Sequence, residues 1–270
     1  NVRGPEPYPA LQAAVATFSM GPVAFCDGIG FEDKDLIMRS VNAEGEILRP
    51  DIPMTCIDSL LVEEAFSSHF KGIWPNGRHR SEIWASRTSL SEDLSWFQVM
   101  IADNPGEYRE IHLDEVFRTT KHKHTSSTQQ RFVEYSVPAL SMNINNISIR
   151  ILDPKGPFLK VQGLELPDFN VRHVAPIIQD IAGNTDIVIL GELSKWVPIS
   201  RQRVVNIVRA PGNLIVDLRG SSGELVEFYF GVIEKDSVSI LSSRCVIRKD
   251  LAQLALTLNS TKQPEASCKS

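Results

Sequence analysis

One carboxylate, Asp27, stands where chemistry on a ligand would need it. It follows a continuous apolar run, residues 23–26, that is typical of a strand buried on both faces. In α/β sheets and barrels the carboxyl ends of the strands form the ligand rim, where Asp27 could accept hydrogen bonds from a substrate. It could also cap the helix that follows. The residues favour neither role, and the two roles can coexist.

Two other motifs have the residue types of known binding sites, one for a dinucleotide and one for a metal. Gly28-Ile29-Gly30 stands between a predicted strand and a predicted helix, as a dinucleotide-binding loop would, but Asp33 takes the place of the third glycine. This favours a tight turn. Lys121-His122-Lys123-His124 holds a His-x-His pair that could chelate a metal, but its lysines oppose a cation and favour a solvated loop. The sequence therefore predicts no cofactor and no metal.

The aromatic and sulfur-containing residues suggest packing more than chemistry. Four tryptophans, at 74, 84, 96 and 196, could stack on sugar rings, but we expect core packing because each ring buries a large apolar area. The four cysteines are too few and too scattered for a disulfide scaffold, and none form a C-x-x-C pair. Two glycosylation acceptors, Asn146-Ile147-Ser148 and Asn259-Ser260-Thr261, point toward secretion but leave the compartment unknown.

The composition excludes several classes of protein. Hydrophobic residues make up 42% and charged residues 23% of 270 residues, which is typical of a globular protein and excludes a disordered chain, a collagen or a coiled coil. There are 28 basic and 33 acidic residues, so there is no basic excess for nucleic-acid binding. No run of 18 apolar residues is present, so we expect no membrane span. The sequence leaves the oligomeric state unknown.

The helices and strands that must position these residues fall into two groups along the chain. Residues 9–20 predict a helix, residues 23–26 a buried strand, and residues from about 32 to 42 a second helix supplied with acidic residues in its first turn. This order is typical of α/β proteins, and a single strand must find its parallel neighbours elsewhere. Because the chain begins at Asn1 without Met, we expect a processed chain or a fragment whose missing strands lie upstream.

After about residue 65 the pattern becomes one of short strands separated by turns. Strands are expected at residues 82–88, 96–100, 108–113, 131–135, 147–152, 187–190, 204–208, 214–218, 225–230 and 238–241. Turn sequences such as Pro211-Gly212-Asn213 lie between them. This spacing is typical of an antiparallel sandwich. The predicted fold class is therefore mainly β, with an all-β sandwich in residues 66–270.

Several segments together resemble one family of enzymes. The chain is similar to the α-galactosidase and raffinose-synthase clan of retaining glycoside hydrolases, at the end of the catalytic (β/α)8 barrel and in the all-β region after it. The resemblance rests on Gly21-Pro22-Val23, Asp27-Gly28-Ile29-Gly30, Leu36-Ile37-Met38-Arg39, Glu44-Gly45-Glu46-Ile47-Leu48-Arg49-Pro50, Pro53, Thr55 and Asp58. The later segments Gly191-Glu192-Leu193 and Lys195-Trp196-Val197-Pro198 look like the C-terminal region of uncharacterised animal and microbial barrel proteins related to that clan.

The resemblance implies a function. Residues 1–65 would be the C-terminal end of the barrel, and the whole protein would hydrolyse α-galactoside-like sugars with two carboxylates about 5 Å apart. Both family carboxylates would lie upstream, so this chain contains no catalytic residue and would be inactive alone. Asp27 would bind the carbohydrate substrate of the intact protein. The alternative is a non-catalytic carbohydrate-binding or structural β module of an inactive glycosidase homologue.

Overall fold

The fold is mainly β, as predicted. The computed structural model describes residues 6–24, 28–66, 82–104, 109–120, 130–136, 147–153, 156–161, 164–179, 181, 185–235, 237–259 and 262–269. Strands make up 52% of these residues and helices 14%. Every pair of strands described is antiparallel. None of the helices in these ranges is long and apolar enough to cross a membrane.

The N-terminal residues form two helices without a described strand between them. α1 (Pro9–Phe18) confirms the predicted helix and buries Phe18, whereas α2 (Lys34–Met38) ends earlier than the predicted residue 42. Ala24 is exposed and, like Val23, belongs to no strand, while Phe25, Cys26 and Asp27 lie outside the described residues. The expected buried strand is thus not formed at residues 23 and 24, and no described strand pairs with them. A lone strand has no ladder partner to hold it.

The larger sheet contains nine strands. Its order is β1-β2-β3-β8-β9-β12-β13, with β5 paired to β8 and β6 paired to β5. The strands are β1 (Ile52–Cys56), β2 (Glu82–Ser89), β3 (Ser95–Asn104), β5 (Phe132–Ser136), β6 (Ser148–Ile151), β8 (Leu164–Ile178), β9 (Asp186–Gly191), β12 (Leu225–Glu234) and β13 (Ser237–Val246). β1 precedes the predicted boundary at residue 65 and pairs with β2, which follows it. The sheet therefore draws on both sides of that boundary.

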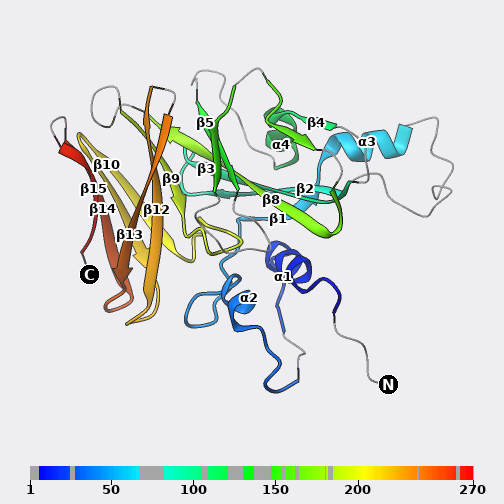
Figure 1. The fold of residues 1–270 in the computed structure, drawn as a ribbon, viewed down its shortest axis with the longest axis horizontal. Coiled ribbons are helices and arrows are strands. Elements are labelled where there is room, and N and C mark those ends of the chain that lie inside the picture. The colour runs from blue at the N-terminus through cyan, green and yellow to red at the C-terminus, as the bar shows by residue number, and fades with distance from the viewer. Residues whose placement is uncertain are drawn as a thin grey trace.

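The remaining elements cover this sheet. A four-stranded sheet consists of β10 (Val204–Ala210), β11 (Asn213–Arg219), β14 (Leu251–Asn259) and β15 (Lys262–Lys269). β4 (Arg109–Ile111) pairs with β7 (Leu159–Val161), and α3 (Asp58–Phe66) and α4 (Leu113–Thr119) lie near them. α1 and α2 lie on one side of the larger sheet, and α3 and α4 lie on the other (Figure 1).

Alternate residues of β3 show how the two faces are buried. Phe97, Val99 and Ile101 belong to a core that includes side chains from α3, α4 and β7. Met100 and Ala102 point to the opposite face and pack with α1. This two-residue period is the normal consequence of strand geometry. On the same face as α1, the larger sheet shares its largest core with the four-stranded sheet.

A disulfide joins these two sheets. Cys245 of β13 bonds to Cys268 of β15, with 5.3 Å between their Cα atoms. The sequence predicted no disulfide scaffold, and the spacing of 23 residues gave no signal for this single bond. It forms because β13 and β15 belong to different sheets that pack against each other.

The sequence analysis missed several elements, and in β8 the local sequence contradicts the structure. β8 has 15 residues and pairs with both β3 and β5, yet Pro167 and Pro176 interrupt its apolar pattern. Proline normally argues against a strand inside a sheet, because it cannot donate to the ladder. β1, β7, β14, β15, α3 and α4 were also not predicted. Of the predicted strands, the one at residues 108–113 shortens to the three residues of β4.

Candidate functional site

The predicted substrate residue Asp27 lies outside the described residues, but the turn after it is described. Gly30 has a φ of +85°, and its N–H donates to the Glu32 carboxylate at 2.8 Å. Asp33 caps α2 by accepting a hydrogen bond from the N–H of Leu36 at 3.0 Å. The residue in place of the third glycine is therefore a helix cap, and the Phe31 N–H closes the predicted tight turn on the Gly28 carbonyl oxygen at 2.9 Å. The substrate-binding role of Asp27 stays a prediction.

The most densely connected polar region is the loop that follows β9. In residues 191–200 every residue except Ser194 is buried, which is unusual for a loop. Gly191 has a φ of +84°, and a Cβ there would lie 2.2 Å from the Pro198 carbonyl oxygen. The same oxygen accepts a hydrogen bond from the Glu192 N–H at 3.0 Å. The loop thus closes tightly on itself, and only glycine fits at its first position.

Lys195 in this loop holds the end of α2. Its ammonium donates to the carbonyl oxygen of Met38 at 2.6 Å and to that of Val41 at 2.7 Å. These carbonyls lie at and just beyond the C-terminus of α2, where an unpaired acceptor needs a donor and the dipole favours a cation. Burial lowers the pKa of Lys195, and the charge of Glu192 opposes this shift. The contact joins two segments that are far apart in the sequence.

Arg39 makes the second contact between the same segments. Its guanidinium carbon lies 3.5 Å from the centre of the Trp196 ring, a cation–π distance. The backbone N–H of Trp196 donates to the Arg39 carbonyl oxygen at 3.0 Å. Burial lowers the pKa of Arg39 to about 10. We call these two sets of contacts the joint: those of Lys195, in the 191–200 loop, with the carbonyls at the end of α2, and those of Arg39 with Trp196.

An ion-pair cluster extends the joint to Arg203, the residue just before β10 of the four-stranded sheet. Arg203 is 1% exposed and donates to Glu192 at 2.6 Å and to Glu224 at 3.0 Å. Glu224 also accepts a hydrogen bond from the backbone N–H of Ala43 at 3.1 Å. One carboxylate thus binds both Arg203 and the turn after α2. Such a buried charge is costly unless its partners are fixed, so the cluster specifies the geometry of the joint.

The two carboxylates respond differently to this environment. Burial raises the pKa of Glu192 more than Arg203 and Lys195 lower it. Burial also raises the pKa of Glu224, but hydrogen bonds and charge from Arg203, with backbone N–H groups, outweigh it and leave that pKa lowered. Burial lowers the pKa of Arg203, but the two carboxylates together raise it above its ordinary value. Arg203 therefore binds one carboxylate whose pKa is raised and one whose pKa is lowered.

Glu192 and Glu224 are two carboxylates that share one arginine, so they can be compared with a glycosidase acid pair. In a retaining glycosidase the two carboxyls flank the sugar and leave room for it. Here Arg203 lies between them and binds both, and Glu192 is 4% exposed. The pair therefore has a structural role.

A row of polar side chains crosses the larger sheet beside the joint. Ser86, Gln98, His173 and Tyr135 stand opposite one another on β2, β3, β8 and β5, and all are buried. The Tyr135 hydroxyl donates to the Leu190 carbonyl oxygen at 2.8 Å, and its ring stacks on His173 with 5.1 Å between centroids. Burial and the charges of Arg39 and Arg172 lower the pKa of His173 to about 3. His173 is therefore neutral at ordinary pH.

The tryptophans and the His-x-His pair were the other candidates from the sequence. Trp96 and Trp196 are 2% and 1% exposed, which confirms the prediction of core packing for both. Trp84 is half-buried and lines a pocket, and Trp74 lies outside the described residues. The His122 and His124 pair also lies outside them. In the ranges that are described, no group of His, Cys, Asp and Glu side chains could hold a metal.

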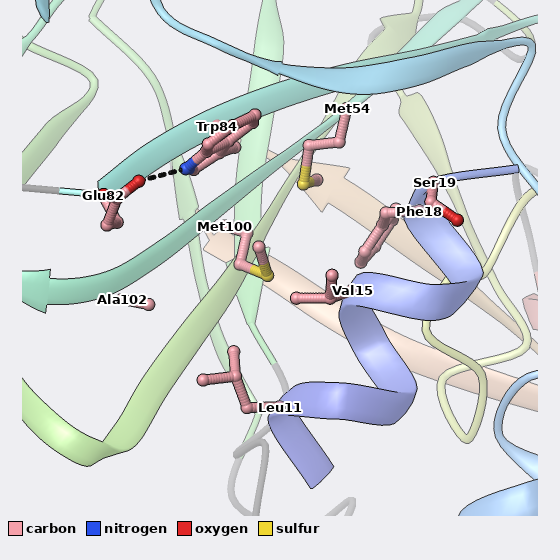
Figure 2. Close-up of a pocket in the computed structure, with 9 residues that line it drawn as sticks. All are labelled: Leu11, Val15, Phe18, Ser19, Met54, Glu82, Trp84, Met100 and Ala102. Carbon is pink, nitrogen blue, oxygen red and sulfur yellow. Dashed lines mark hydrogen bonds between the residues drawn. The ribbon is translucent and has the colours of Figure 1, made fainter. Parts of the chain in front are cut away.

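The pocket beside Trp84 lies between α1 and the larger sheet. It has a volume of about 410 Å³ and is lined mostly by apolar side chains. Figure 2 shows Leu11 and Val15 of α1 facing Met100 of β3, with the Glu82 carboxylate hydrogen-bonded to the Trp84 indole. The sequence gave no signal for this pocket, because its walls come from four separate segments.

Sequence reasoning found some joint residues only through the family resemblance. Arg39, Lys195 and Trp196 belong to its motifs, whereas Glu224, Arg203 and His173 were missed. A charged residue in a strand or loop looks like a surface residue until its partners are known. No protein-family model and no curated protein matches this chain.

Proposed function

We propose that this chain is the C-terminal portion of an α-galactosidase-like retaining glycoside hydrolase. In this proposal residues 1–65 are the end of a (β/α)8 barrel, and residues 66–270 are a β-sandwich that supports it. The catalytic carboxylates lie upstream, and the substrate is an α-linked galactoside or a similar sugar. The observation that supports this most is the joint, in which the two separate groups of family-like motifs contact each other.

The joint supports different roles for residues 1–65 and residues 66–270. Arg39 and Met38 belong to the barrel-like motif, and Lys195 and Trp196 belong to the later motif. Their contacts are direct, at 2.6 Å from Lys195 to Met38 and 3.5 Å from Arg39 to the Trp196 ring. Residues that hold an α/β segment on a β-sheet are what a supporting domain needs. A sugar site would instead present such groups to solvent.

Two placements favour this role over a sugar-binding module, the alternative function. Trp96 and Trp196 are buried and cannot stack on a sugar. The pocket beside Trp84 presents few hydrogen-bonding groups, whereas a sugar needs several. Asp33 caps α2, the helix that Asp27 was alternatively expected to cap.

An assay of nitrophenol release from nitrophenyl α-galactoside tests the proposal. We expect no release above the buffer rate from the 270-residue chain, and hydrolysis with retention of configuration by the protein from the complete reading frame. Release by the chain alone would contradict the placement of the carboxylates. If the complete protein carries no aspartate pair and releases nothing, the inactive β-module alternative is correct.

A matched pair of variants in the complete protein tests Asp27. Asp27→Asn keeps the size but loses the charge, so we expect kcat/KM to fall about 10- to 100-fold, as for a hydrogen bond to a charged group. Asp33→Ala should instead cost about 1 kcal/mol of stability, because it removes a helix cap, and leave kcat/KM unchanged. An Asp27→Asn enzyme with wild-type kcat/KM would make Asp27 a structural residue.

A further inference from the structure

The pocket between α1 and the larger sheet has the size and lining of a small-molecule site. Its volume of about 410 Å³ lies within the usual range for ligand pockets, roughly 300–1,000 Å³. Leu11 and Val15 form its helical wall, and Met54, Trp84 and Met100 form its sheet wall (Figure 2). Val15 is 43% exposed although it lines the pocket, so the pocket is open to solvent at this wall.

The apolar walls define the body of the ligand. Leu, Val, Trp and two Met side chains offer no hydrogen bonds to a hydroxylated molecule, apart from one indole N–H that is already used. Met54 and Met100 are flexible and polarizable, and such side chains adjust to guests of different shape. The body of the ligand is therefore an alkyl chain or an aromatic ring.

The single charged side chain that lines the pocket defines the head group of the ligand. Glu82 contributes a carboxylate, and neither Lys nor Arg lines the pocket. One carboxylate oxygen accepts the Trp84 indole N–H at 2.7 Å, which orients both the carboxylate and the ring. A carboxylate beside a tryptophan ring attracts a cation and repels an anion, because the ring face is also negative.

We propose that this pocket binds an organic cation with an apolar body, such as an alkyl- or arylammonium. The ammonium lies against Glu82 and the Trp84 ring, and the body lies between α1 and the two methionines. The inference is independent of the proposed glycosidase role. A second copy of this chain, inserting an apolar segment at Val15, is the competing occupant.

A series of three probes with equal chain length tests the charge of the head. Octyltrimethylammonium, octanol and octanoate are titrated separately into the full chain, with calorimetry and tryptophan fluorescence as readouts. We expect one saturable site with the affinity order ammonium, then alcohol, then carboxylate. Equal affinity for octanoate and the ammonium, or no saturable binding of the ammonium, would overturn the proposal.

Three variants test the location. Glu82→Gln keeps an acceptor for the Trp84 indole but loses the charge, so ammonium affinity should fall about five- to tenfold and octanol affinity should not change. Val15→Trp should abolish binding by filling the pocket from its exposed side. Val208→Trp is the matched control, because Val208 is also 43% exposed but lies on β10, and it should bind normally.

Two outcomes would contradict the site. Wild-type ammonium affinity in both Glu82→Gln and Val15→Trp would place binding elsewhere on the protein. A dimer in analytical ultracentrifugation that dissociates in Val15→Trp and persists in Val208→Trp would assign the pocket to a second copy of this chain.

Discussion

The Lys195 ammonium donates a 2.7 Å hydrogen bond to the carbonyl oxygen of Val41, across more than half of the chain. The same ammonium holds the Met38 carbonyl at 2.6 Å. One side chain of the 191–200 loop therefore fixes the backbone just after α2. Together with Arg39 on Trp196, it makes the N-terminal helices part of the same packed structure as the larger sheet.

Replacing this ammonium should destabilise the protein strongly. Lys195→Met leaves the buried carbonyl oxygen of Val41 and the half-buried one of Met38 without this donor, and we expect the free energy of unfolding to fall by about 3 kcal/mol. Urea denaturation measures this as a lower midpoint. Lys34→Met removes an exposed lysine of α2 and should stay within about 0.5 kcal/mol of wild type. If the two variants are equally stable, the joint contributes little.

The buried His173 should make the fold sensitive to acid. Its pKa is about 3 in the folded protein, below the ordinary 6.5, so between these pH values the unfolded chain binds a proton that the folded chain does not. Stability is therefore complete above pH 6.5 and is lost as the pH falls toward 3. Between pH 7.5 and 5 the loss should be about 2 kcal/mol, before most carboxylates titrate.

A pair of histidine variants isolates this effect by chemical denaturation at several pH values. His173→Phe retains a ring beside Tyr135 and should lose most of the decline between pH 7.5 and 5. His112→Phe replaces an exposed histidine and should keep the wild-type decline. The same pH dependence in His173→Phe as in wild type would show that other groups cause it.

The disulfide between the two sheets should stabilise the fold measurably. Cys245 and Cys268 are 23 residues apart, and closing a loop of this length contributes about 3 kcal/mol in the chain-entropy model. We expect dithiothreitol to lower the urea midpoint of the wild type accordingly. The double variant Cys245→Ala, Cys268→Ala should start near the reduced value and not respond to dithiothreitol. An unchanged wild-type midpoint after complete reduction would contradict this.

Much of the strand content could be predicted from the sequence because it depends on local patterns. Strands β2, β3 and β9–β13 have apolar runs or alternations bounded by polar residues or by Gly and Pro turns, and α1 has a first-turn proline and alanines. The signals failed where tertiary packing overrides local preference. β8 keeps Pro176 in a buried position, where it stands opposite Phe132 of β5, and the strand pairs with both β3 and β5.

The sequence by itself determined the mainly β class and the tight turn at Gly30, since each depends on neighbouring residues. Only the tertiary structure decided that Lys195 meets the end of α2, that Arg203 binds two glutamates and that His173 is neutral. These groups are polar, and their sequence context resembles that of solvated residues. Their partners are set by strand register and loop closure, across 154 residues from Lys195 to Val41 and across 11 and 21 residues from Arg203 to its two glutamates. Burial then makes their charges and hydrogen bonds decisive.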